Sequence, residues 1–255
     1  MLYWCMSYDD LNKNGYRNIK IPKYLLSLIK KSILLNINYK FKKNFKSYKF
    51  FNKHLKTISN KEFIKKFGPK VLRNIDSKCA EKINLWVKKN VPKKINFNKA
   101  SLNMITKLEC SENEYLKKDQ FCAFYRIVRK NKKDVGHPHK DSSFMKLGIV
   151  RKAKFKPKSV WKCWIPLIGV NNQNTLNMIK SSHKDNINIE YVKKNGATKP
   201  KVPENYIKIN SHRIVKPIKH DGSEGVLFHP DTVHFANVNK TTDFRISIEF
   251  NIFVK

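Results

Sequence analysis

Acidic residues are scarce in this chain. Its 255 residues include 19 Asp and Glu against 54 Lys and Arg, so the formal net charge is +35 at pH 7. Only seven of the basic residues are arginine, and lysine is abundant together with Asn, Ile and Phe, as in proteins encoded by AT-rich sequences. The charge either attracts an anionic partner or reflects this composition. Because the lysines are spread over the whole chain, composition is the favoured explanation.

The chain also lacks cysteine pairs with metal-binding spacing. There are five cysteines, an odd number, and none of them is part of a CxxC motif. This pattern argues against a disulfide framework and against a zinc site built from cysteine, and it suits a reducing compartment.

Long apolar runs are missing as well. The longest one near the N-terminus, YLLSLIKKSILL, is interrupted by Lys30 and Lys31, so it is too short and too charged to span a bilayer. The opening residues MLYWCMSYDD have no basic start and no long apolar stretch, so we expect no signal peptide. Together these features predict a cytoplasmic protein without a membrane span.

The residues that are present suit a folded protein with a core. Hydrophobic residues make up 40% of the chain and aromatic residues 12%. In the first part of the chain, apolar residues recur at helical spacing, and Ser59 or Asn60 is placed to cap a helix. We expect helices over residues 22–35, 59–68 and 69–90.

From about residue 105 the pattern changes to an alternation with period two. Several runs rich in aromatic and β-branched residues are separated by turn signals, and no helix-length insert stands between them. We expect strands over residues 121–129, 159–170, 206–218, 225–230 and 244–255. The predicted fold class is α+β. A double-stranded β-helix (jelly roll) over residues 105–255 would be buttressed by a helical region over residues 1–104, in one integrated domain.

Two histidine-bearing segments lie in the strand-rich part of the chain. The first, GHPHKDSS, contains His139 and Asp141 as an HxD pair. The second, HPDTVHFANVN, contains His234, 93 residues after Asp141. Two imidazoles and one carboxylate leave coordination positions free, which a non-heme Fe(II) oxygenase needs and a structural zinc site does not.

Arg245 follows His234 by 11 residues, in the run FRISIEFNIF. On a strand, Arg245 and Ser247 would share a polar face with Glu249 and Asn251, and the apolar residues between them would share the other face. A guanidinium with a hydroxyl two residues on can bind both oxygens of a carboxylate, such as the distal carboxylate of 2-oxoglutarate. An exposed arginine on an edge strand is the alternative.

Residues 105–253 resemble the Fe(II)- and 2-oxoglutarate-dependent dioxygenases, in particular the phytanoyl-CoA-hydroxylase-like branch. The resemblance rests on GHPHKD after the strand FYRIVRK, on WKCWIPL, on NTLNMIKSSHK, and on HFANVN followed by FRISIEF. DVGHPHKDSS and FYRIVRK also resemble oxygenases found in bacterial surface-carbohydrate and aminoglycoside gene clusters. The segment IKSSHK departs from the family's pattern, because Ile179 and Lys180 replace small or proline positions.

This resemblance implies the roles of five residues. His139, Asp141 and His234 would bind iron. Arg245 would bind 2-oxoglutarate, with Ser247 as a second donor.

Other residues near these motifs are candidates for contact with the substrate. His137 lies four residues before Asp141, which does not fit HxD, so we expect it at the mouth of the site or in a turn. Arg126, in the strand before the metal loop, and Asn237 are further candidates. Lys162 is placed to reach a carboxylate of the cosubstrate.

The favoured function is an oxygenase that uses Fe(II), 2-oxoglutarate and O₂ to hydroxylate or otherwise oxidise a small polar substrate. An anionic sugar derivative or nucleotide sugar in carbohydrate biosynthesis suits the basic charge. A zinc hydrolase of the metallo-β-lactamase type is an alternative, since HPHKDS resembles HxHxDH, although Ser142 stands where that family needs histidine. A basic nucleic-acid-binding protein is the third hypothesis. Because the lysines are spread along the chain and form no clustered basic patch in the sequence, we expect no specific nucleic acid as a partner.

Overall fold

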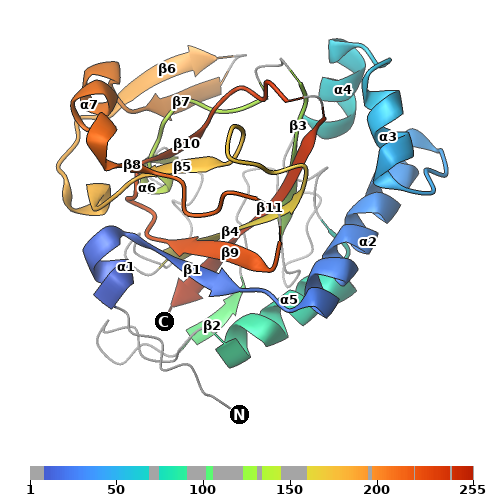
Figure 1. The fold of residues 1–255 in the computed structure, drawn as a ribbon, viewed down its shortest axis with the longest axis horizontal. Coiled ribbons are helices and arrows are strands. Elements are labelled where there is room, and N and C mark those ends of the chain that lie inside the picture. The colour runs from blue at the N-terminus through green and yellow to red at the C-terminus, as the bar shows by residue number, and fades with distance from the viewer. Residues whose placement is uncertain are drawn as a thin grey trace.

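The strand-rich part of the chain forms antiparallel sheets. A computed structural model describes residues 9–68, 75–90, 102–105, 123–130, 134–144, 160–194, 197–220, 222–241 and 243–254. Within these residues the larger sheet has six strands in the order β1-β9-β4-β11-β2, and β3 also pairs with β11 (Figure 1). Its strands are β1 (Tyr16–Lys20), β2 (Leu102–Ile105), β3 (Phe124–Val128), β4 (Val160–Ile168), β9 (Glu224–Phe228) and β11 (Arg245–Val254).

A smaller sheet packs against the larger one. Its strands are β10 (His234–Ala236), β5 (Leu176–Ile179) and β8 (Ile214–Val215), in that order. Trp164 and Phe228 of the larger sheet form a buried cluster with Leu176 and Met178 of the smaller sheet. A separate hairpin joins β6 (Glu190–Lys194) to β7 (Ala197–Lys201).

Most helices lie in the first part of the chain, as the apolar spacing predicts. They are α1 (Asp9–Asn14), α2 (Lys23–Phe41), α3 (Tyr48–Leu55), α4 (Asn60–Phe67) and α5 (Ser77–Asn90). α2 begins after Pro22, which is favoured at a helix start, and continues beyond the predicted end at residue 35. Ser59 caps α4, because its hydroxyl accepts a hydrogen bond of 3.1 Å from the backbone N–H of Glu62. Residues 69–74 of the third predicted helix lie outside the described residues.

The two faces of β11 differ in the way its alternating sequence predicts. Ile246, Ile248, Phe250 and Ile252 are buried in a core shared with helices α2 to α5. The polar residues between them face the smaller sheet, where Arg245 donates a hydrogen bond to a carbonyl before β5. The helices therefore cover one face of the larger sheet, as Figure 1 shows, and leave the other for polar side chains.

One predicted strand is wrong in its first half. Residues 206–218 contain the larger part of α7 (Glu204–Ile209), a short 3₁₀ helix (Ser211–Arg213) and only then the two-residue strand β8. Pro203 precedes α7 with φ of −55°, which suits a helix start, and Glu204 places an acid in the first turn. These two residues at the helix start favour a helix more than the short apolar alternation favours a strand.

Strands β1 and β2 lie within the segment for which the sequence predicts helices. β1 pairs along its whole length with β9, from Tyr16 opposite Phe228 to Lys20 opposite Glu224. Ile19 is the one buried residue of β1. The strand therefore lacks the alternation of apolar and polar residues by which a strand is recognised in a sequence.

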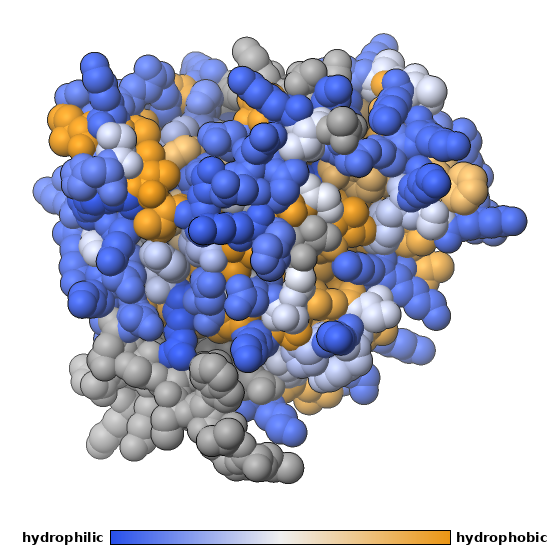
Figure 2. Space-filling view, viewed as in Figure 1, coloured by the Kyte–Doolittle hydropathy of each residue, from blue (hydrophilic) through white to orange (hydrophobic). Residues whose placement is uncertain are grey.

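Hydrophilic residues are spread over most of the face seen in Figure 2. No helix among the described residues is long and apolar enough to cross a bilayer.

A buried phenylalanine of α3 tests whether the helices and the sheets unfold as one unit. Phe51 is fully buried against Phe41, Phe67 and Phe244, and Phe244 directly precedes β11. We expect Phe51→Ala to lower the free energy of unfolding by about 3–5 kcal/mol in a single transition. Its neighbour Phe50 is 53% exposed, so Phe50→Ala should change it by less than about 0.5 kcal/mol. Two separate unfolding transitions in urea would contradict a shared core.

Candidate metal centre

Two chain segments pair to place His139 beside His234. The backbone N–H of His139 donates to the carbonyl of His234 at 3.2 Å, and the N–H of His234 donates back at 3.1 Å. Residues paired in this antiparallel way project their side chains to the same side. The two imidazole rings accordingly lie with their centroids 4.4 Å apart.

Each imidazole is held by a backbone carbonyl two residues earlier in the chain. Nδ1 of His139 lies 2.6 Å from the carbonyl of His137, and Nδ1 of His234 lies 3.0 Å from that of Thr232. A carbonyl only accepts, so both Nδ1 atoms carry the hydrogen. This leaves the Nε2 lone pair of each ring free to bind a metal.

Asp141, the first residue of the short helix α6 (Asp141–Phe144), completes the cluster. Its two carboxylate oxygens lie 3.8 Å from Nε2 of His139 and 3.7 Å from Nε2 of His234. One donor atom from each of the three residues lies within 4.8 Å of the others. Oδ2 of Asp141 is buried and accepts no hydrogen bond in the described residues. Two imidazole nitrogens and a carboxylate oxygen thus fit a divalent metal ion.

The protonation states of the cluster also suit metal binding. Burial lowers the pKa of His139 to about 3, with His234 lowering it further and Asp141 opposing the shift. Burial alone would raise the pKa of Asp141, but Lys162 and the two histidines outweigh it and the net pKa is lowered. A neutral imidazole and an ionised carboxylate are the forms that bind a metal.

Arg245 is a buried cation on the inner face of β11. It is 2% exposed, its Nη1 donates to the carbonyl of Asn174, and its Nε has no hydrogen-bond partner in the part of the chain that the structure describes. No carboxylate in the described part of the chain lies within 4.0 Å of its guanidinium. Burial lowers its pKa to about 9, with Arg126 acting in the same direction and Glu249 against it. Ser247 is 1% exposed on the same face of β11.

Of the three candidates for substrate contact, Arg126 lies on the inner face of the larger sheet, and His137 and Asn237 are close to the cluster in sequence. Arg126 of β3 is paired in register with Ser247, and its guanidinium lies 3.6 Å from the carboxylate of Glu249. His137 is half-buried two residues before His139, and Asn237 is exposed directly after β10.

Arg129 and His229, which lie close to the site in sequence, contact other groups. Arg129 donates two hydrogen bonds of 2.8 Å to Asp134 and lies 3.6 Å from the ring centre of Phe63, so it joins β3 to helix α4. Nδ1 of His229 accepts a hydrogen bond from the backbone of Asp231.

A loop after β5 supports the strand that carries His234. The hydroxyl of Ser182 donates to the carbonyl of Ile179 at 2.7 Å and accepts from the backbone N–H of Val233 at 2.9 Å. Val233 directly precedes His234, so this buried serine fixes the backbone that presents the imidazole.

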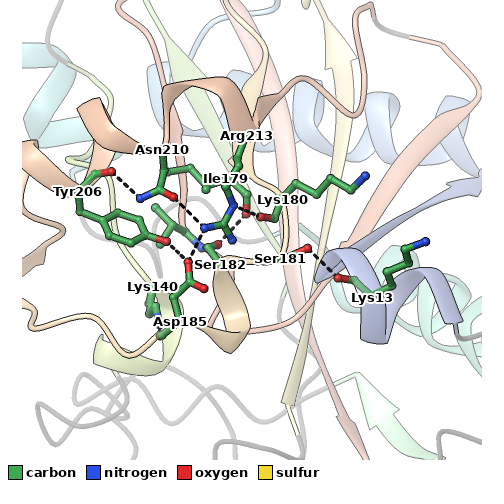
Figure 3. A network of polar contacts seen from close by, with 11 residues as sticks. Lys13, Lys140, Ile179, Lys180, Ser181, Ser182, Asp185, Tyr206, Asn210 and Arg213 are labelled. Atoms are coloured by element: carbon green, nitrogen blue, oxygen red, sulfur yellow. Dashed lines mark hydrogen bonds and ion pairs between the residues drawn. The ribbon is translucent and has the colours of Figure 1, made fainter.

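Asp185 in the same loop is the centre of a polar network, shown in Figure 3. Its carboxylate accepts a hydrogen bond of 2.8 Å from Arg213 and another from the hydroxyl of Tyr206. Its backbone carbonyl accepts one of 3.0 Å from Lys140, which lies between the two metal-binding candidates of the HxD pair. The sequence analysis missed this network, because its members are single polar residues far apart in the chain.

Solved structures share this fold. A scan of protein-family models and a search of curated proteins find no match to the sequence. EctD from S. alaskensis with 2-oxoglutarate and 5-hydroxyectoine has a TM-score of 0.55 at 11% identity, over 96% of this chain and 73% of that one. The non-heme monooxygenase ThoJ has a TM-score of 0.53 at 11% identity, over 97% and 78% of the two chains. EvdMO1 has a TM-score of 0.54 at 11% identity, over 96% of this chain and 48% of that one.

At this identity the comparisons establish a shared fold and not a shared activity. The predicted resemblance to iron- and 2-oxoglutarate-dependent oxygenases is therefore confirmed at the level of the fold.

Two neighbouring histidines give a matched test of the cluster. His139→Ala removes a ligand, and we expect it to weaken Co(II) binding more than about 100-fold, since even changes to groups behind the ligands cost about 10–100-fold. His137→Ala keeps the backbone carbonyl that holds His139 and should bind Co(II) as the wild type does. Calorimetric titration of metal-free protein measures both, and equal affinities in the two variants would refute the assignment.

The Asp185 network predicts an acid-dependent contribution to stability. Burial raises the pKa of Asp185, but Tyr206 and Arg213 outweigh it, so the net pKa is lowered. A group with a lowered pKa stabilises the fold above its unfolded pKa, and the contribution is lost as the pH falls through the folded value. We expect Asp185→Asn to cost about 1–3 kcal/mol at pH 7 and progressively less below pH of about 4. Denaturant unfolding at several pH values measures this, with Asp10→Asn at an exposed position as the control.

Proposed function

We propose that this chain is a non-heme Fe(II)- and 2-oxoglutarate-dependent oxygenase with a jelly-roll core. The observation that carries the proposal is the buried guanidinium of Arg245, which has no carboxylate partner among the described residues and lies on the same side of the larger sheet as the His139-Asp141-His234 cluster. A buried charge without a counter-charge is costly, so the position calls for an anionic ligand. A dicarboxylate that also chelates a metal meets both requirements.

The jelly-roll core is supported by the arrangement of the sheets. The larger and smaller sheets are antiparallel and pack on one another, and the metal cluster lies at the pairing of His139 with the first residue of β10. The solved structure of EctD with this fold contains 2-oxoglutarate, and another contains Fe.

The residues of this chain would hold and orient the reactants. His139, Asp141 and His234 would hold Fe(II), and the Nδ1 atoms of the two histidines donate to backbone carbonyls, so that the rings keep their orientation. Arg245 binds the distal carboxylate of 2-oxoglutarate, and Ser247 adds a hydrogen-bond donor. When bound, iron, 2-oxoglutarate and O₂ supply the oxidation of a substrate C–H bond to C–OH, with succinate and CO₂ as the other products.

The substrate is proposed to be a small polar metabolite, such as a sugar or nucleotide-sugar derivative in cytoplasmic carbohydrate biosynthesis. Arg126 supports this proposal because its side chain is 29% exposed on the inner face, so it is both charged and accessible. His137 and Asn237, which lie in the two histidine-bearing segments, are proposed as further contacts of the same molecule.

The zinc-hydrolase alternative finds no support in the geometry around Ser142. This residue stands where the hydrolase motif needs a third histidine. Its hydroxyl donates a hydrogen bond to Asp231, and its backbone N–H donates to the carbonyl of Pro230. Neither partner is a member of the metal cluster.

Formation of succinate tests the proposed activity. Protein with Fe(II), 2-oxoglutarate and O₂ should form succinate slowly even without substrate, and metal-free protein should form none. Arg245→Met removes charged hydrogen bonds to the distal carboxylate, so we expect the half-saturating concentration of 2-oxoglutarate to rise roughly 10- to 100-fold. Co(II) affinity should stay the same, because Arg245 is not a metal ligand. An unchanged requirement for 2-oxoglutarate would contradict the role of Arg245.

A further inference from the structure

Lys162 is a second buried cation on the inner face of the larger sheet. It lies in the middle of β4, in register with Asn251 of β11 on one side and Phe228 of β9 on the other. It is only 7% exposed, and its Nζ lies 3.7 Å from Oδ2 of Asp141. That distance is longer than a hydrogen bond, and Nζ donates none to any residue that the structure describes.

The neighbour of Lys162 on β11 is also unsatisfied. Asn251 is 6% exposed, and its Oδ1 is buried without a hydrogen-bond donor in the described residues. Buried polar groups are normally hydrogen-bonded, so each such group needs an explanation. The ammonium of Lys162 is a charged donor, and Oδ1 of Asn251 beside it is an acceptor without a donor in the described residues. This pair matches a ligand that has an anionic group next to a hydroxyl.

The balance of charge around the metal points to the same ligand. In the protein alone, Asp141 is the counter-charge of Lys162. When a divalent metal binds Asp141, the metal neutralises that carboxylate and leaves Lys162 without a counter-charge. Arg126 keeps the carboxylate of Glu249 as its partner. Lys162 is then a buried cation that lacks an anion, which is costly unless a ligand supplies one.

The sequence also makes Lys162 a candidate for a carboxylate of 2-oxoglutarate, but in the proposed function both carboxylates of that molecule have other partners. Asn251, in register with Lys162, lies six residues along β11 from Arg245, which corresponds to about 20 Å on an extended strand. The carboxylate bound at Arg245 is therefore far along the strand from Lys162, and the other carboxylate of the cosubstrate would bind the metal. The substrate is the remaining source of an anionic group.

We propose that Lys162 and Asn251 form the anchor for the substrate, and that the substrate carries a carboxylate or phosphate with a hydroxyl beside it. The ammonium of Lys162 binds the anionic group, and Oδ1 of Asn251 accepts the hydroxyl hydrogen. This inference rests on the proposed oxygenase function, and it narrows the substrate class to hydroxylated acids and phosphate esters.

Three small molecules with one carbon skeleton provide the test: glycerate, glycerol 3-phosphate and glycerol. Each is titrated at constant ionic strength into protein that holds Co(II) and 2-oxoglutarate, and the visible spectrum of Co(II) reports binding next to the metal. We expect at least one of the two anions to shift the spectrum and glycerol to leave it unchanged. Lys162→Met should weaken that binding roughly 10-fold or more, and Lys162→Arg should retain most of it. Lys180→Met, at an exposed position, is the control for net charge.

Each other outcome overturns the proposal for a distinct reason. Equal affinity in Lys162→Met means that the anion reaches the metal without the lysine. Loss of the Co(II) spectrum in Lys162→Met means that the lysine only positions Asp141. No binding of either anion to wild type, while 2-oxoglutarate still changes the Co(II) spectrum, refutes the anchor and leaves the oxygenase intact. If 2-oxoglutarate itself causes no spectral change, the proposed function fails and the anchor fails with it.

Discussion

The candidate site depends on one short antiparallel pairing, between His139 and His234. Two backbone hydrogen bonds, of 3.2 and 3.1 Å, bring together segments that are 95 residues apart and place both imidazoles on one side. Each ring is then fixed by a carbonyl of its own segment, and Asp141 follows on the first turn of α6. Ser182 holds the backbone next to His234, and Asp185 accepts a hydrogen bond from Lys140 next to His139. The positions of the three metal-binding side chains are therefore determined by backbone and loop structure before any metal binds.

The two-faced strands β4 and β11 make a polar interior possible. Most of their apolar residues are buried under the helices, where a stabilising core forms at a distance from the site. Their polar residues face inward, where Arg245 and Lys162 are buried without full compensation. Burial of such cations lowers the free energy of unfolding of the ligand-free protein, and binding of an anionic ligand raises it again. The net charge of +35 adds little to this argument, because the argument depends on specific cations of the inner face, Arg126, Lys162 and Arg245, and not on the many exposed lysines.

Residue type and spacing in the sequence were enough to predict that His139, Asp141 and His234 belong together and that Arg245 faces inward. An HxD pair, a later histidine and an alternating strand each carry a strong physical signal. The Asp185 network had no such signal, because it joins single polar residues from separate loops. Residues 204–209 form a helix although their apolar residues suggest a strand, since Pro203 and Glu204 favour a helix start. The unsatisfied state of Lys162 and Asn251 depends on three-dimensional contacts, so only the structure shows it.

The central claim is that His139, Asp141, His234 and Arg245 together hold Fe(II) chelated by 2-oxoglutarate. The most direct test is the visible spectrum of metal-stripped protein mixed with Fe(II) and 2-oxoglutarate without oxygen. We predict a metal-to-ligand charge-transfer band in the wild type that is missing in His139→Ala. Absence of the band in wild type, with both iron and 2-oxoglutarate in excess, would contradict the claim and leave the cluster as a site for a different metal and chemistry.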